Sequence, residues 1–149
     1  MFLKNIHAKN FRGFEEIAVE FSEGINLLVG NNGSGKTSLI EAISLALGTG
    51  LYLLHGVSTR FMDDNTVRYV YKKDGDATHS LQRQFPQYIT CDLMWMDALI
   101  TSIGMTRKGE ASNTEISNYD LPKKLSLTLN NNNIKAPIFC LQNFDRDWH

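Results

Sequence analysis

The chain has 149 residues, 42% of them hydrophobic, with 15 basic and 16 acidic side chains and a formal net charge of −1. This length predicts one globular domain, residues 1–149, that buries roughly 70% of the surface its unfolded form exposes. The near-neutral charge excludes a basic footprint for tight nucleic-acid binding by the chain alone.

Cysteine usage and hydropathy exclude further classes of protein. Cys91 and Cys140 form no Cys-x-x-Cys pair, so zinc and redox motifs are absent, and we expect both to be buried free thiols. No signal-peptide pattern is present, and no apolar run approaches the roughly 20 residues of a membrane span. We therefore expect a cytoplasmic protein with no membrane partner.

The first fifty residues carry the clearest structural patterns. Residues 2–21 predict two strands joined at Gly13, because Ile17, Val19 and Phe21 repeat at the period of a half-buried strand. Residues 25–29 are almost continuously apolar, which predicts a strand covered on both faces. A helix that ends at Gly48 should follow. Its apolar stripe consists of Leu39, Ile40, Ile43, Leu45 and Leu47.

The remaining elements are predicted from shorter patterns. Residues 67–71, 81–85 and 89–95 are predicted to be strands, and Ile89, Cys91, Leu93 and Trp95 share one face of the last. Residues 98–103 are expected to pair with that strand as a hairpin, followed by a polar loop at 104–113. A short helix is predicted at 121–129 and a short strand at 137–141. Residues 63–64, both aspartates, are expected to form a solvated turn rather than a metal site.

Residues 30–37, Gly-Asn-Asn-Gly-Ser-Gly-Lys-Thr, match the Walker A pattern G-x-x-x-x-G-K-[ST] at every fixed position. The motif predicts binding of a nucleoside triphosphate, and ATP with Mg²⁺ is the expected ligand. Glycines at 33 and 35 permit positive φ angles, so that backbone amides approach the phosphates. Lys36 should neutralise the β and γ oxygens, and Thr37 should offer its hydroxyl to Mg²⁺. An ordinary glycine-rich turn before a helix is the alternative, but it would not need Lys36 and Thr37 at that offset.

The predicted nucleotide-binding residues of this loop and of the start of its helix are Asn32, Gly33, Ser34, Gly35, Lys36, Thr37 and Ser38. A Ras-type GTPase is excluded, because the chain has neither an Asn-Lys-x-Asp nor an Asp-x-x-Gly motif.

A resemblance becomes specific when the loop is taken with what precedes it. Residues 9–14, Lys-Asn-Phe-Arg-Gly-Phe, and residues 21–37 together resemble the N-terminal lobe of the RecF/SMC/OLD branch of ABC-type ATPases, and the likeness is strong over residues 1–48. It implies an α/β P-loop fold, with a mixed sheet around the Walker A helix. It also implies that Arg12 lies near the nucleotide and that Gln142 is a Q-loop residue contacting Mg²⁺ and the attacking water. A solvated turn arginine and an exposed strand-end glutamine are the alternatives.

The sequence departs from this family in its second half. It has no Leu-Ser-Gly-Gly-type signature, no Asp-Glu Walker B and no switch histidine, and it ends seven residues beyond Gln142. We therefore expect the first ATPase lobe alone, from a truncated gene or a split protein. The complete protein is expected to hydrolyse ATP in DNA maintenance, DNA repair or anti-phage defence, with Lys36 and Gln142 as catalytic residues.

The resemblance also implies partners and leaves two other functions open. The completing lobe and a second subunit, as in a homodimer, would supply the missing parts, and DNA would be reached only through the intact protein. A nucleotide-binding module without activity and a small P-loop kinase are the alternative functions. Removal of the second lobe should leave apolar surface, so this chain is expected to self-associate above micromolar concentrations.

Overall fold

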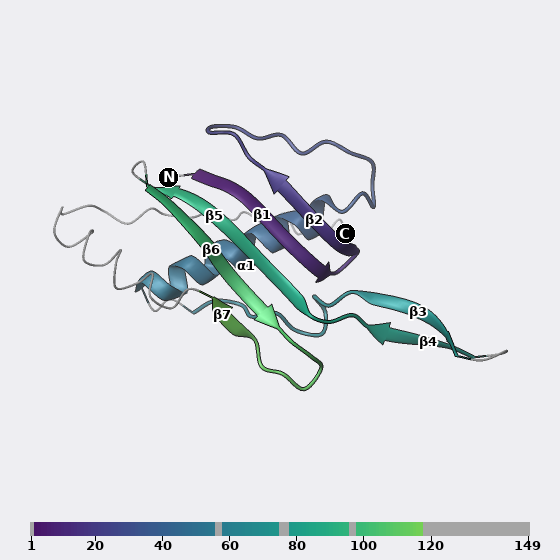
Figure 1. Cartoon of the computed structure of the whole chain (residues 1–149). Coiled ribbons are helices and arrows are strands. Elements are labelled where there is room, and N and C mark those ends of the chain that lie inside the picture. The colour runs from purple at the N-terminus through teal and green to yellow at the C-terminus, as the bar shows by residue number, and fades with distance from the viewer. Residues whose placement is uncertain (1, 56–57, 75–77, 96–97, 118–149) are drawn as a thin grey trace, which may run out of the picture.

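The computed structural model describes residues 2–55, 58–74, 78–95 and 98–117. Its elements in chain order are β1 (Phe2–Phe11), β2 (Phe14–Glu20), α1 (Lys36–His55), β3 (Tyr69–Asp74), β4 (Thr78–Arg83), β5 (Gln87–Trp95), β6 (Ala98–Arg107) and β7 (Glu115–Ser117). Five strands form one sheet in the order β2-β1-β5-β6-β7, and every described pairing is antiparallel. Helix α1 crosses one face of this sheet, against β1, β5 and β6 (Figure 1). The expected α/β lobe with a sheet against the Walker A helix is confirmed, although a mixed sheet was expected and the pairings within the described residues are all antiparallel.

The core lies between α1 and the sheet. Alternate residues of each strand point into it, as a sheet with one solvated face requires. The buried apolar residues of this cluster are Ile6, Ala8, Phe11, Leu39, Ala42, Leu45, Ala46, Met62, Ile89, Cys91, Leu93, Ile103 and Met105, and Ile17, Val19 and Phe21 pack against it. The predicted faces of β2 and β5 are therefore confirmed, apart from Trp95, whose side chain lies outside the described part.

Burial has a chemical consequence for one core residue. Cys91 is a free, buried thiol, as the sequence predicted. Removal from water, followed by the nearby Asp92 carboxylate, raises the pKa of the Cys91 thiol to about 12. The thiolate is the reactive form of cysteine, so Cys91 is a chemically inert part of the core. Cys140 lies outside the described residues.

The strand predicted at residues 25–29 is wrong. The segment is irregular, and Ile25, Leu27 and Val29 are 98%, 83% and 83% exposed. Only Leu28, between them, packs against the core. A run of apolar side chains indicates that a segment can be buried, but a strand also needs a neighbour to pair its backbone. Within the described part of the chain, no strand pairs with residues 25–29.

The predicted helix end at Gly48 is also wrong, because α1 continues to His55. Leu39 and Leu45 of the predicted stripe are buried, whereas Ile40 is exposed. Gly48 lies where the returning chain crosses the helix, and a Cβ on it would come within 2.5 Å of Thr59 Oγ1. Close packing, rather than a left-handed cap, accounts for this glycine.

The remaining differences concern strand limits. Residues 104–107, predicted as loop, continue β6, and Gly104, Met105 and Arg107 are buried there. Strand β7 was missed, because a strand of three residues shows no periodicity. The predicted strands at 67–71 and 81–85 exist with shifted limits, as β3 and β4. They form a separate two-stranded sheet, a hairpin that projects from the body of the molecule (Figure 1). The helix at 121–129, the strand at 137–141 and Gln142 fall outside the described residues.

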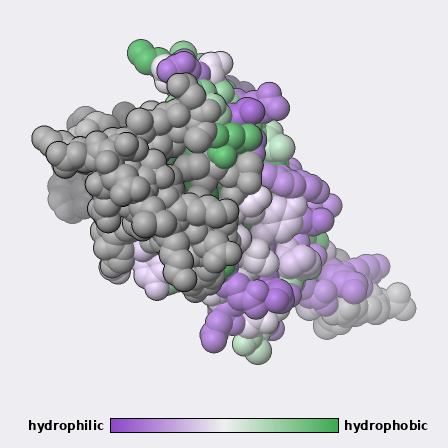
Figure 2. Space-filling model, turned by 60° about the vertical axis from the view of Figure 1, so that its left-hand side comes forward, coloured by the Kyte–Doolittle hydropathy of each residue, from purple (hydrophilic) through white to green (hydrophobic). Residues whose placement is uncertain are grey.

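The outer surface is predominantly polar on the side shown in Figure 2, where hydrophilic residues cover most of the described area and hydrophobic ones form small patches. No helix in the described ranges is both long and apolar enough to cross a bilayer.

The pairing of β5 with β6 gives a test of the fold. A Cβ at Gly104 would lie 1.9 Å from the carbonyl oxygen of Ile89, which is backbone and cannot rotate away. Gly104→Ala should therefore lower the free energy of unfolding by about 3 kcal/mol, measured by urea denaturation. Gly109→Ala is the matched control, because the nearest atom, Ser112 Oγ, is 3.5 Å away. Equal midpoints for the two variants would contradict this strand pairing.

Candidate phosphate-binding site

The Walker A loop leads directly into α1, which begins at Lys36. The first turn of a helix presents backbone N–H groups without intrahelical partners, and the helix dipole makes that end attractive to anions. Gly33 and Gly35 have φ angles of +80° and +91°. This confirms the predicted backbone of the loop, in which residues with a Cβ would be strained. The geometry is that of an anion cradle at a helix N-terminus.

Lys36 folds back into the loop that precedes it. Its ammonium donates to the carbonyl oxygens of Gly30, at 2.6 Å, and Asn31, at 2.7 Å, and lies 3.3 Å from Ser34 Oγ. The positive charge is therefore held inside the cradle by the loop's own oxygens. An arriving phosphate can take over these contacts, because its oxygens are stronger acceptors for a cation than neutral carbonyls are.

The other predicted loop residues lie around this lysine. Asn32, Ser34 and Thr37 are exposed, and Ser38 is half-buried at the start of α1. The Thr37 hydroxyl is one oxygen ligand of the kind that Mg²⁺ accepts alongside phosphate oxygens and water. The described ranges contain no group of three or more His, Cys, Asp or Glu residues able to hold a metal by themselves.

An aromatic ring that the sequence analysis missed supports the loop. Phe14 begins β2, and a Cβ placed on Gly35 would lie 2.6 Å from the tip of its ring. Glycine at 35 is therefore required by packing as well as by its φ angle. The only signal in the sequence is that Phe14 follows the Asn-Phe-Arg-Gly turn, and nothing local shows that this turn meets the loop.

The fold places Arg12 against α1, beside Glu41, which follows Lys36 by five residues. It lies in the β1–β2 turn with a φ angle of +48°, and it forms an ion pair through Nε with Glu41 Oε2. Arg60 Nη2 meets the other oxygen of the same carboxylate at 3.0 Å. Arg12 is thus a paired, partly exposed side chain rather than a freely solvated one. Glu41 and Arg60 were not among the predicted site residues, although Glu41 is a single carboxylate within an apolar helical stripe.

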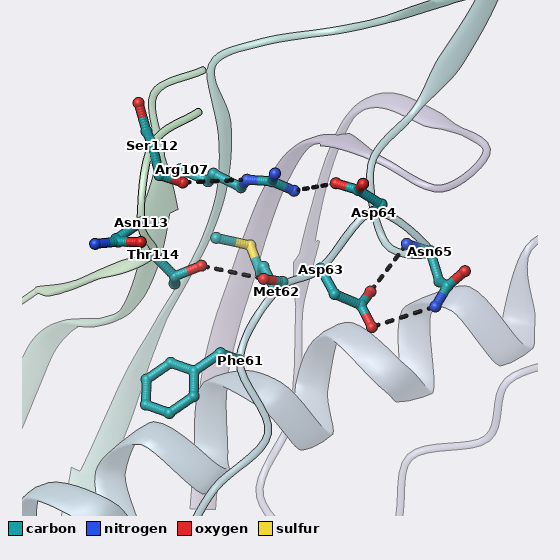
Figure 3. Close-up of a pocket in the computed structure, with 9 residues that line it drawn as sticks. All are labelled: Phe61, Met62, Asp63, Asp64, Asn65, Arg107, Ser112, Asn113 and Thr114. Carbon is teal, nitrogen blue, oxygen red and sulfur yellow. Dashed lines mark hydrogen bonds and ion pairs between the residues drawn. The ribbon is translucent and has the colours of Figure 1, made fainter. Parts of the chain in front are cut away.

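A second hollow, of about 670 Å³, lies away from the loop (Figure 3). Its polar groups bind one another: Arg107 donates to Asp64 at 2.8 Å and to the carbonyl oxygen of Ser112 at 3.4 Å. This contact with Arg107 holds the pKa of the Asp64 carboxyl below its ordinary value. Asp63 accepts the backbone N–H groups of Asn65 and Thr66, so the predicted turn at 63–64 is confirmed. None of the predicted site residues lines this hollow.

Comparison with known proteins places these features in a family. A family model described as an AAA ATPase domain matches residues 1–148. The DNA replication and repair protein RecF of Carboxydothermus hydrogenoformans is 42% identical over 69 residues, 46% of this chain and 18% of the relative. The DNA double-strand break repair Rad50 ATPase of Pyrococcus abyssi is 39% identical over 75 residues, 50% of this chain and 8% of the relative. The matches therefore span less than a fifth of these relatives.

A solved structure has a similar fold at low sequence identity. It was reported in work on the ATP-driven dimerization and DNA-stimulated activation of SMC ATPases. The similarity has a TM-score of 0.50 and a sequence identity of 14%, and covers 87% of this chain and 80% of the other.

The contact between Phe14 and Gly35 can be tested with stability alone. Gly35→Ala should lower the free energy of unfolding by about 2–3 kcal/mol, through backbone strain and the clash with the ring. Gly33→Ala has the strain without a neighbour within 4 Å and should cost only about 1 kcal/mol. In a Phe14→Ala background, the two alanine substitutions should become equivalent. A Gly35→Ala cost that is unchanged in that background would show that the ring does not support the loop.

Proposed function

Because the chain belongs to the AAA ATPase domain family and is similar to RecF and Rad50 over about half of its length, we propose that it is the N-terminal lobe of a RecF/SMC-like ABC-type ATPase and that residues 30–37 bind the phosphates of Mg·ATP. The observation that carries the proposal is the loop itself: two glycines with positive φ angles, a lysine held inside the cradle, and a helix that begins at that lysine. We further propose that the complete protein hydrolyses ATP in DNA maintenance, repair or anti-phage defence.

Each residue of the loop has a distinct task in this proposal. Backbone amides of residues 32–37 cradle the α and β phosphates, Lys36 moves from its carbonyl acceptors to the β and γ oxygens, and Thr37 binds Mg²⁺. Phosphoryl transfer depends mainly on positioning and on neutralising the charge of the transferred group. Mg²⁺ supplies part of that neutralisation when bound. Gln142 is proposed to contact Mg²⁺ and the attacking water.

Completion by a second lobe is supported by the exposed apolar segment 25–29, which leads into the loop. Its exposed apolar side chains, Ile25, Leu27 and Val29, are at alternate positions, as in a strand whose face is covered by a neighbour. RecF and Rad50 relatives extend far beyond the matched region. We propose that the completing lobe pairs with this segment and supplies the general base, and that a second subunit closes the site. The DNA-repair roles in the relatives' names support DNA as the target of the intact protein.

Nucleotide binding should depend on Lys36 and should occur without turnover. Lys36→Ala should weaken ATP binding by at least about tenfold in calorimetric titration with Mg²⁺, because a charge-assisted contact is lost. Phosphate release by the unaltered chain should stay near background, since the general base lies elsewhere. Lys72→Ala, an exposed lysine on the β3–β4 hairpin, is the matched control. Equal losses of ATP affinity in the two variants would contradict the proposed site. Rapid phosphate release would contradict the proposal that the general base lies outside this chain.

The apolar segment should drive self-association of this chain. Leu27→Lys should reduce association above about micromolar concentration, measured by light scattering. The free energy of unfolding should change by less than about 0.5 kcal/mol, because the side chain already faces solvent. Leu28→Lys is the control with the opposite expectation. Leu28 packs on the core, so this substitution should lower the free energy of unfolding by about 1–2 kcal/mol. A monodisperse monomer before any substitution would refute the hypothesis that this segment mediates association.

A further inference from the structure

We propose that Glu41 is a positioning residue, which fixes the Arg12 guanidinium beside the phosphate loop so that Arg12 can contribute to nucleotide binding. This inference rests on the function proposed above for the loop. It assigns a role to a carboxylate that the sequence motif does not include and that does not itself touch the nucleotide.

Three separate parts of the chain converge on this carboxylate. Glu41 lies in the second turn of α1, Arg12 in the β1–β2 turn, and Arg60 in the segment that returns along the helix. The Glu41 side chain is only 14% exposed. A carboxylate withdrawn from water to this degree is stable only with charged or hydrogen-bonding partners. Among the described residues, Glu41 is also the one carboxylate that forms an ion pair with either arginine.

The position of Glu41 on the helix brings Arg12 close to the proposed metal-binding hydroxyl. Glu41 follows Thr37 by four residues, and side chains at this spacing lie on the same helix face, about 5–6 Å apart. A guanidinium bound to Glu41 is therefore within a side-chain length of the cradle. Nε provides only one of the five N–H donors of arginine, so the terminal nitrogens keep donors for a phosphate.

The backbone of Arg12 is already fixed relative to the loop. Its N–H donates to the carbonyl oxygen of Thr66 at 2.7 Å, and Phe14, two residues later, packs against Gly35. The freedom left to Arg12 is that of its long side chain, whose ordering costs conformational entropy. By holding Nε, Glu41 removes much of that freedom before nucleotide arrives.

Arg60 completes the electrostatics of the cluster. It pairs with the second carboxylate oxygen and leaves the first to Arg12, so the two ion pairs do not compete for one atom. Two guanidinium groups around one carboxylate leave a formal charge of +1 next to the proposed anion site. Glu41 can thus orient Arg12 without cancelling the positive charge that attracts phosphate.

The inference is tested by a double-mutant cycle on ATP affinity in the presence of Mg²⁺, with the unaltered chain, Arg12→Ala, Glu41→Gln and the double variant. Arg12→Ala should weaken ATP binding about tenfold when Glu41 is present, and less than about twofold in the Glu41→Gln background. A purely structural role for Glu41 would change stability but would leave the Arg12→Ala loss the same in both backgrounds. That equal loss would overturn the inference.

Three further measurements make the result unambiguous. Glu41→Asp keeps the charge but withdraws the carboxylate by one methylene. In this background the loss of ATP affinity caused by Arg12→Ala should fall below about fivefold. The variant also replaces Glu41→Gln in the cycle if Glu41→Gln does not fold. Arg60→Ala should leave the Arg12→Ala loss intact. If Arg12→Ala leaves ATP affinity unchanged while Lys36→Ala abolishes ATP binding, the inference is overturned and the proposed function stands. Absence of ATP binding by the unaltered chain would overturn both.

Discussion

The close packing of α1 on the sheet is the constraint on which the rest of the structure depends. Ala42 and Ala46 are both essentially fully buried, and their small side chains let the helix approach the strands closely. Leu39 and Leu45 then fill the space on either side, against the inward residues of β1, β5 and β6. Because α1 begins with Lys36, this apolar contact also fixes where the loop's amides point. The position of a polar site is thus set by hydrophobic packing.

Those parts of the molecule that depend on short-range patterns were predictable from sequence. Strands β1 and β2, their turn at Gly13, the glycine conformations of the loop and the start of α1 all follow from local spacing or from a motif. Long-range contacts were not predictable. Glycine is a common residue at the end of a helix, but the close packing of Gly48 against Thr59 determines its role here. Glu41 meets Arg12 and Arg60 only after the chain has folded back twice.

The failure at residues 25–29 has a different cause. The pattern there is typical of a segment that can be buried, but the described residues offer it no covering layer. Local pattern and tertiary environment disagree at the segment that leads into the proposed nucleotide site. Such disagreement is expected where a protein binds another surface, because burying exposed apolar area in the contact lowers the free energy. The loop and this segment are adjacent in the chain, so covering one would restrain the other.

The β3–β4 hairpin lies outside the five-stranded sheet and shares no strand ladder with it. Arg83 and Arg107 both bind Asp64 at its base, at 2.9 and 2.8 Å, and these contacts tie it to the body of the lobe. An added or removed pair of residues along the hairpin would lengthen or shorten an arm without shifting the register of β1, β5 or β6. This arm is consequently suited to a grafted peptide tag or fluorophore that must leave the Walker A loop undisturbed.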